Sequence, residues 1–399
     1  MKKLIVIMLL SQIMIPCLRA QKKELSQARS CLKSGNDLEK AEQILVGTLA
    51  KDSSDNHKIK VYKLLYQIAQ KQYELGNEKL YLKEPYDTAL IFNVTKRMFA
   101  LAETLDSIDA RPDKKGNVKP TYRRRHSSEL DDHRANLYNG GLFFIRKSDL
   151  KTAFAFFDAY LDCAVQPLFS QYSYSKSDKR MAQAAYWASY CGHRLQLPEM
   201  TLKYLDTALG DTIHEKQLLY YAAEAYNANG DLKNYLRLLH EGFERFPDFS
   251  YFFPRLIDYY IRKDKLDTAL SLADRALAHN PDNQLFLLAK STILLNLEDY
   301  DSCISLSDSL ISTNDTIPEA YYNAATALLN KILRIEAENA PNKRELVRRL
   351  YTLACPYMEK YRLLKPDDND KWAPALYRIY LNLNMGKQFE EIDRILNGN

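Results

Sequence analysis

The chain has 399 residues, a formal net charge of +5, and few residues that break helices, with 12 Gly and 14 Pro. Both counts lie below the average usage of roughly 7% and 5%, which favours an all-helical fold. The small net charge excludes a strong overall attraction to nucleic acid.

Residues 1–20 predict an export signal. A short basic start is followed by an apolar run from Leu4 to Pro16, and Ala20 stands at a suitable position for cleavage before Gln21. The apolar run is too short to span a bilayer comfortably. We therefore expect a cleaved, periplasmic protein without a transmembrane segment in the mature chain.

Two alternatives remain for this N-terminal segment. Cys17 could carry a lipid anchor, although Pro16 replaces the small residue that lipoprotein signals prefer, so anchoring is the less favoured interpretation. The apolar run could also be a buried first helix. Cleavage after Ala20 would lower the formal charge from +5 to +2.

Residues 21–110 predict degenerate helix pairs. Apolar residues with helical spacing precede and follow a polar turn at 34–37, which indicates one pair over 22–52. A longer pair is expected over 57–108. Its first helix should end near Gly76, and Pro85 should mark a loop at 78–87.

Residues 111–133 predict a basic linker. Pro112, Gly116 and Pro120 oppose helix formation, so a loop is expected over 111–127. This segment is either a solvated linker or a binding site for an anionic polymer. The basic-loop candidates are Lys114, Lys115, Arg123, Arg124 and Arg125.

Residues 134–399 predict an array of helix pairs closed by a capping helix. In the pair over 134–162, Gly140 and Gly141 fall where two helices should cross closely. An aromatic interruption at 163–180 is either a contact patch or a loop folded over the neighbouring repeat. Another pair is expected over 182–214.

Residues 216–283 carry the clearest repeat. Its two copies align about 34 positions apart when Gly230 is placed over Asp264. In the second copy an apolar stripe from Phe253 to Tyr260 marks the first helix. The second helix has small residues, Ala269 and Ala276, where it should approach the first.

The remaining segments continue the pattern to the end of the chain. Helix pairs are expected over 284–317, over 318–368 with an insertion at 339–342, and over 369–397. Such pairs cannot bury their apolar faces alone, so stacking of neighbours is required.

This 34-residue pattern resembles the tetratricopeptide repeat (TPR) family. The resemblance implies an all-α, right-handed α-solenoid of about eight or nine TPR-like helix pairs. The Trp that the family favours in the first helix is replaced by other bulky residues, namely Leu219, Phe253, Leu287 and Tyr321.

The resemblance also implies a concave groove lined by the first helices. The family positions, carried onto this chain, give a partner-binding groove of mixed charge with several aromatic residues. These residues are Gln217, Tyr220, Glu224, Asn227, Tyr251, Asp258, Arg262 and Tyr322. The family's carboxylate-clamp pattern, with Lys and Asn at set groove positions, is absent here. The alternative is that these are ordinary exposed helix residues.

No reactive constellation stands out in the sequence. The chain has no P-loop, GxGxxG, GxSxG or HExxH motif, and Cys191-Gly192-His193 is a weak metal signal. A disulfide between Cys163 and Cys191 is possible in an oxidising compartment. We therefore expect a protein without catalytic residues, metal or cofactor.

The leading hypothesis is an exported TPR-like scaffold that binds a protein or peptide in its groove at the cell envelope. The alternatives are a carbohydrate-binding or nutrient-binding helical-repeat protein, and an anionic-polymer binder that uses the basic loop. Nucleic acid is not an expected partner.

Overall fold

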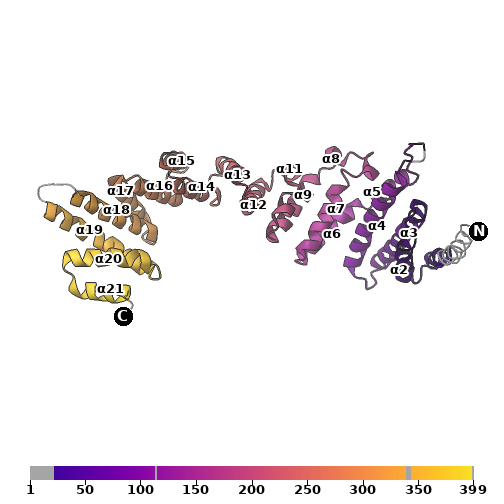
Figure 1. The fold of residues 1–399 in the computed structure, drawn as a ribbon, viewed down its shortest axis with the longest axis horizontal. Coiled ribbons are helices and arrows are strands. Elements are labelled where there is room, and N and C mark those ends of the chain that lie inside the picture. The colour runs from indigo at the N-terminus through magenta and orange to yellow at the C-terminus, as the bar shows by residue number, and fades with distance from the viewer. Residues whose placement is uncertain (1–21, 113–114, 338–342, 398–399) are drawn as a thin grey trace, which may run out of the picture. The chain divides into compact units, whose positions relative to one another are not determined.

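The computed structural model describes residues 22–112, 115–337 and 343–397. Within these ranges every regular element is a helix, which confirms the all-α prediction (Figure 1). The predicted signal sequence, Cys17 and the insertion at 339–342 lie outside the described residues. No helix in the described ranges is both long and apolar enough to cross a bilayer.

The chain divides into two compact units, with the boundary between Tyr235 and Leu236. The first unit begins with a helix at 22–34 and continues with α2 (Leu38–Leu49), α3 (Asp55–Tyr81), α4 (Thr88–Asp109), α5 (Arg123–Asp131), α6 (Arg134–Arg146), α7 (Leu150–Asp162), η1 (Pro167–Phe169), α8 (Tyr174–Ser177), α9 (Met181–Arg194), α10 (Pro198–Leu202), α11 (Leu205–Ala208) and α12 (Glu215–Ala228).

The boundary falls inside α13 (Leu232–Arg245). The second unit continues with α14 (Phe252–Arg262), α15 (Leu266–His279), α16 (Gln284–Asn296), α17 (Tyr300–Thr313), α18 (Pro318–Ala337), α19 (Lys343–Leu364), α20 (Asn369–Leu383) and α21 (Gly386–Asn397).

Helices in each unit pack mainly on their neighbours in the chain. In the first unit α2 contacts α3, α3 contacts α4, α4 contacts α6, and α7 contacts α9. In the second, contacts run in order from α14 to α21. This sequential packing is the arrangement that helix-pair repeats require, and the described helices group into the predicted eight or nine consecutive pairs.

The basic segment 111–133 does not separate the units, although the sequence suggested a boundary there. One apolar core continues past it, from Phe99 on α4 to Phe169 on η1, with ring centroids 5.7 Å apart. The same core includes Leu218 on α12. Contacts between residues far apart in sequence therefore join the segments on both sides of the basic segment.

The glycine pair on α6 confirms the predicted close crossing. A Cβ atom on Gly140 would lie 2.7 Å from a ring carbon of Phe156, and one on Gly141 would lie 2.5 Å from a ring carbon of Phe157. These distances are too short for any side chain. Glycine at both positions therefore lets the aromatic rings of α7 reach the α6 backbone.

The predicted loop over 111–127 is wrong at its C-terminal end, because α5 begins at Arg123. The helix-breaking residues all precede position 121, and Pro120 is the last of them. Arg125 and Glu129 form an ion pair four residues apart, Nε to Oε1 at 2.8 Å. His126 and Leu130, also four apart, are buried and fix the helix against the unit.

The first long helix also differs from the prediction. The structure continues α3 past Gly76 to Tyr81, where the sequence led us to expect an earlier end. A Cβ atom on Gly76 would lie 2.6 Å from the Tyr86 hydroxyl, so this glycine accommodates a packed ring inside the helix rather than ending it.

The aromatic segment 163–180 folds over the neighbouring repeat, which was one of its two interpretations. Phe169 and Tyr174 are buried. The guanidinium of Arg134 lies 3.8 Å from the Tyr160 ring centroid and 3.9 Å from that of Tyr174, and donates to Asp178 at 2.6 Å. A buried cation thus fastens the segment to α6 and α7.

Candidate binding site

The predicted groove residues fall into both units. Gln217, Tyr220, Glu224 and Asn227 all lie on α12 in the first unit, partly or fully exposed. The other four predicted residues, Tyr251, Asp258, Arg262 and Tyr322, lie in the second unit.

Tyr251 is buried, so the prediction that it lines an exposed groove is wrong. Only 7% of its surface is accessible, and the Arg255 guanidinium lies 3.7 Å from its ring centroid. The family position assumed that Tyr251 was inside the first helix. In the structure α14 begins one residue later, at Phe252, and Tyr251 packs against the Phe252 ring.

The remaining second-unit residues are accessible but spread out. Asp258 and Arg262 are exposed and pair with each other, Oδ1 to Nε at 3.0 Å, one turn apart on α14. Tyr322 on α18 is half-buried, with its ring centroid 5.1 Å from that of Tyr361. Two hollows of this unit, lined by residues of α15, α16 and α17, include none of the three.

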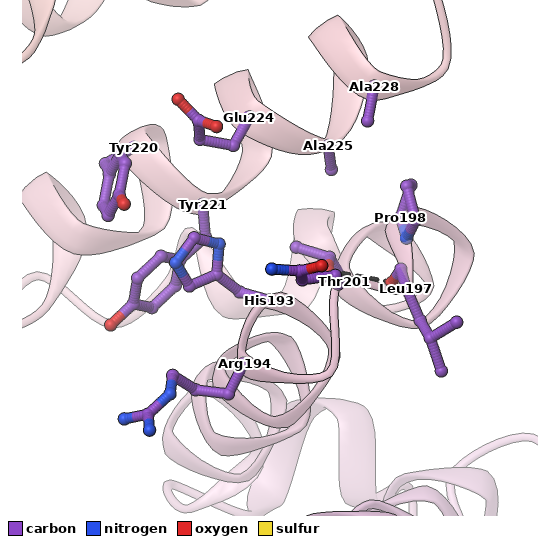
Figure 2. A pocket seen from close by; sticks show the side chains of 11 residues that line it. His193, Arg194, Leu197, Pro198, Thr201, Tyr220, Tyr221, Glu224, Ala225 and Ala228 are labelled. Carbon is purple, nitrogen blue, oxygen red and sulfur yellow. Dashed lines mark hydrogen bonds between the residues drawn. The ribbon is translucent and has the colours of Figure 1, made fainter.

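Two of the predicted residues, Tyr220 and Glu224, do meet in a hollow of about 600 Å³. Figure 2 shows it between the end of α9, α10 and one side of α12. The residues that line it are His193, Arg194, Gln196, Leu197, Pro198, Thr201, Tyr220, Tyr221, Glu224, Ala225 and Ala228. We call it the α9–α12 hollow.

The shape of the hollow follows from how the chain turns after α9. Gln196 has a left-handed backbone (φ 57°), and Pro198 begins a short helix that ends at Leu202. A Cβ atom on Gly192 would lie 2.3 Å from the backbone nitrogen of Thr201. The backbones of α9 and α10 are therefore almost in contact. The Thr201 hydroxyl donates to the Leu197 carbonyl at 3.0 Å and closes the turn.

Three aromatic rings form one wall of the hollow. His193 stacks on Tyr221 with centroids 4.3 Å apart and planes at 22°, and meets Tyr220 nearly edge-on at 5.0 Å. The rings of Tyr220 and Tyr221 are 5.4 Å apart. All three residues are only partly buried. Stacked rings of this kind offer rigid contact area at a small cost in side-chain entropy.

The polar groups of the hollow are few and of both signs. Burial lowers the pKa of His193, opposed by the Glu224 carboxylate, so the imidazole is neutral at pH 7. Arg194 donates to the Tyr190 hydroxyl at 3.2 Å. Alanines at 225 and 228 leave room along α12. The hollow therefore offers ring faces, one carboxylate and one guanidinium to a bound molecule.

The weak metal signal at Cys191-Gly192-His193 has a structural explanation. Cys191 is fully buried, and burial raises the pKa of its thiol to about 12, so it stays protonated. His193 faces the hollow instead. In the described ranges no three His, Cys, Asp or Glu side chains gather as a metal site. Cys163 and Cys191 are both free thiols.

Sequence reasoning missed His193 and Tyr221. His193 lies on α9, the first helix of the pair expected over 182–214, to which the groove positions were not carried. Tyr221 lies one residue beyond the predicted Tyr220 on α12. The signal that could have found His193 was the repeat itself, because His193 stands 34 residues before the predicted Asn227.

The predicted basic loop is largely neutralised. Arg123 makes two hydrogen bonds to the buried Asp106, at 2.9 and 2.8 Å, and Arg125 pairs with Glu129. Arg124 and Lys115 are exposed. Lys114 lies outside the described residues. Arg123 and Arg125, two of the three consecutive arginines in this segment, therefore make contacts within the protein.

Comparison with solved structures finds TPR proteins. The C-terminal part of a TPR repeat-containing protein from Cytophaga hutchinsonii gives a TM-score of 0.44 at 11% identity, covering 64% of this chain and 92% of that one. Yeast Tom70 gives 0.37 at 12% identity, covering 92% and 89%. YrrB, titled a TPR protein with an unusual peptide-binding site, gives 0.25 at 16%, covering 61% and 93%.

No protein-family model matches the chain, and a search of curated proteins finds no match. The TM-scores quoted are all below 0.5, so the assignment of an all-α repeat fold rests on the chain's own helices. The TPR resemblance is therefore drawn from the repeat of residues 216–283.

Proposed function

We propose that this protein is a TPR-like scaffold that binds a protein or peptide segment in the α9–α12 hollow. The observation that carries the proposal is the wall of three partly exposed rings, His193, Tyr220 and Tyr221, beside the Glu224 carboxylate. Aromatic residues of this kind dominate the energy of protein interfaces. Helix-pair arrays present such surfaces on a stiff frame.

The groups in the hollow are suited to recognition rather than reaction. Its rings and its two oppositely charged side chains can stack and hydrogen-bond, whereas its one neighbouring thiol, Cys191, is buried and protonated. A nucleophile must be accessible and activated. We therefore assign the site a non-enzymatic role without a cofactor.

Export to the cell envelope is part of the proposal and rests on residues 1–20 of the sequence alone. We expect the secreted chain to begin at Gln21. N-terminal sequencing of the protein purified from a periplasmic extract of its own cells tests this. A chain that still begins at Met1 and remains in the cytoplasm would remove the envelope from the proposal.

Site-specific photo-crosslinking tests the binding site. A benzophenone amino acid in place of Tyr220 should crosslink to a defined segment of another protein in intact cells. The matched control places the same amino acid at Tyr81, which is 84% exposed at the end of α3. Crosslinks that do not differ between the two positions would count against the hollow as the site.

A carbohydrate ligand is the second candidate, because stacked Tyr and His rings also suit the apolar faces of sugars. A glycan array probed with the wild-type chain and with Tyr221→Ala distinguishes the two functions. Binding to a defined glycan that is lost in the variant would favour the sugar. The anionic-polymer alternative is weakened by the ion pairs of Arg123 and Arg125.

A further inference from the structure

Four aromatic rings form a continuous row across α9 and α12. The ring centroids of Trp187 and Tyr190 on α9 are 5.6 Å apart, and the Tyr190 centroid lies 6.3 Å from that of Tyr221 on α12. Tyr221 in turn stacks on His193 at 4.3 Å, as Figure 2 shows. All four side chains are half-buried. We call them the ring row, which extends the aromatic wall of the α9–α12 hollow to Tyr190 and Trp187.

The ring row has a fixed position because of how α9 is packed. Trp187, Tyr190 and His193 follow one another in steps of three residues, and each step turns the side chain by about 60° around a helix. Tyr221 joins them from α12, which packs against α9. The alanines at 184 and 188 are fully buried in the core, so α9 cannot rotate. The rings therefore form a rigid surface that loses little side-chain entropy when a ligand binds.

The tilt between the rings determines what can lie on them. The planes of Trp187 and Tyr190 meet at 87°, and those of Tyr190 and Tyr221 meet at 58°. Rings inclined in this way form wedge-shaped notches on either side of Tyr190 rather than one flat platform. Such a notch accepts a compact apolar side chain that contacts ring faces on both sides. The pyrrolidine ring of proline has this shape, because it is short, closed and apolar.

The polar groups beside the ring row are mainly hydrogen-bond donors. Arg194 donates to the Tyr190 hydroxyl at 3.2 Å, so this hydroxyl keeps its own hydrogen to donate to a ligand. Arg194 and Gln196 are exposed and bring further N–H groups to the hollow. Glu224 is the one carboxylate among the lining residues, and it does not belong to the ring row. These donors suit a ligand that offers carbonyl oxygens and few N–H groups.

Other modes of peptide recognition suit this surface less well. Strand addition needs the open edge of a sheet, and the regular elements of the described residues are all helices. Docking of an amphipathic helix needs a long apolar groove, whereas Leu197 is the one long aliphatic side chain that lines the hollow. Recognition of an acidic motif needs a cluster of arginines, and one arginine lines the hollow. Proline-rich segments, in contrast, dock in grooves lined by aromatic rings.

We propose that the ring row binds a proline-rich segment of the partner in the polyproline II conformation. Its proline rings would enter the notches beside Tyr190. Its carbonyl groups, which make no internal hydrogen bonds in this conformation, would accept from the Tyr190 hydroxyl and the Arg194 guanidinium. This inference rests on the proposed function, because the segment would be the one that the α9–α12 hollow receives.

Ligand-observed saturation-transfer NMR on the whole chain tests the proposal, because it detects weak binding of short peptides. The probe is a peptide of nine L-prolines with acetyl and amide ends. The matched control has the same composition but alternates L- and D-proline, which prevents a polyproline II helix because φ changes sign at every residue. We expect transfer to the proline ring protons of the L-peptide, with an affinity about tenfold or more above that of the control. The affinity should change little with salt, since the peptide is uncharged.

Substitutions of Tyr190 locate the binding on the ring row. Tyr190→Ala should weaken binding of the L-proline peptide by about tenfold or more, because it removes both notches. Tyr190→Phe keeps the ring and loses the hydroxyl donor, so a loss of about two- to tenfold is expected. It also provides a milder variant should the alanine substitution disturb folding. The control is Tyr81→Ala, at a position 84% exposed on α3, which should bind within about twofold of the wild type.

Three results would overturn the inference. The first is saturation transfer that is absent from the L-proline peptide or equal for the two peptides. The second is an equal affinity of the Tyr190→Ala and Tyr81→Ala variants for the L-proline peptide. The third is a segment crosslinked at Tyr220 that contains no proline, which would leave the proposed function standing. Binding of the L-proline peptide without any crosslink at Tyr220 in cells would support the ring row and count against the proposed function alone.

Discussion

Gly192 shows how a single residue shapes the candidate site. Gly192 lies in the last turn of α9, next to His193. The backbone of α10 passes so close that a Cβ atom on Gly192 would lie 2.3 Å from the Thr201 nitrogen and 2.7 Å from the Met200 carbonyl carbon. Backbone atoms cannot move aside as a side chain end can. The position of α10, and with it one wall of the hollow, therefore depends on this glycine.

We expect Gly192→Ala to destabilise the protein by about 1–3 kcal/mol, the usual cost of overpacking, because the backbones of α9 and α10 must separate. The free energy of unfolding from urea titration measures this. The control is Gly47→Ala on α2, where a Cβ atom meets nothing within 4 Å. That control should gain up to about 1 kcal/mol from helix propensity.

Glu103 on α4 makes stability depend on pH. Burial raises the pKa of its carboxyl group to about 7, with a further contribution from the Asp162 carboxylate, from an ordinary value of 4.5. Between about pH 4.5 and pH 7 this carboxyl group is therefore protonated in the folded state and ionised in the unfolded state. Stability from this group is present below about pH 4.5 and is lost as the pH rises to about 7.

Glu103→Gln should therefore be more stable than the wild type at pH 8, and the difference should disappear near pH 4.5. Thermal midpoints measured from pH 4.5 to pH 8.5 test this expectation. Glu84→Gln, in an exposed turn, is the control for loss of one negative charge. A constant offset between Glu103→Gln and the wild type at all pH values would contradict it.

At the scale of elements, α5 shows that a basic stretch can be a structural helix. Its first residue, Arg123, holds the Asp106 carboxylate, which is only 6% exposed, while the next residue, Arg124, faces solvent. The tight pairing raises the pKa of the Arg123 guanidinium further above its ordinary value. The two adjacent arginines thus have different roles, because they lie on different sides of α5.

We expect Arg123→Ala to cost about 1–3 kcal/mol, since a buried carboxylate loses its hydrogen-bonded partner. Arg124→Ala should change the free energy of unfolding by less than about 0.5 kcal/mol, as exposed positions usually do. Limited proteolysis within 111–131 gives a second measurement, and cleavage should accelerate only for Arg123→Ala. Equal effects of both substitutions would refute the different roles.

At the scale of the whole molecule, the described helices form two units whose members pack mainly on their sequence neighbours. In such arrays stability is close to a sum over repeats and their nearest interfaces, so a local defect stays local. The cores support this view. The cluster around Leu376 on α20 and the cluster around Leu45 on α2 share no residues.

We expect Leu376→Ala to accelerate hydrogen exchange over α18–α21 while leaving α2–α4 unchanged. Leu376 is fully buried, and such truncations usually cost about 2–5 kcal/mol. Leu45→Ala, at an equally buried position, should give the reverse pattern. Exchange that rises evenly along the chain in either variant would show that the chain unfolds as one cooperative block.

Much of the fold could be predicted from local patterns. The apolar stripes of 216–283 predicted α12 to α15, and the glycines at 140 and 141 predicted a close helix contact that the Phe156 and Phe157 rings make. Less of the candidate site could be predicted. Tyr220 and Glu224 lie in the hollow, whereas Tyr251 is buried and His193 was not among the expected groove residues.

The sequence by itself determined that this chain is a succession of helix pairs, because helical periodicity and small crossing residues are properties of short segments. Only the tertiary structure decided which aromatic rings face solvent and which arginines are paired. Those properties depend on neighbours contributed by other helices, such as Asp106 for Arg123 and Tyr221 for His193. No local pattern in the sequence identifies the distant side chain that packs against a given residue.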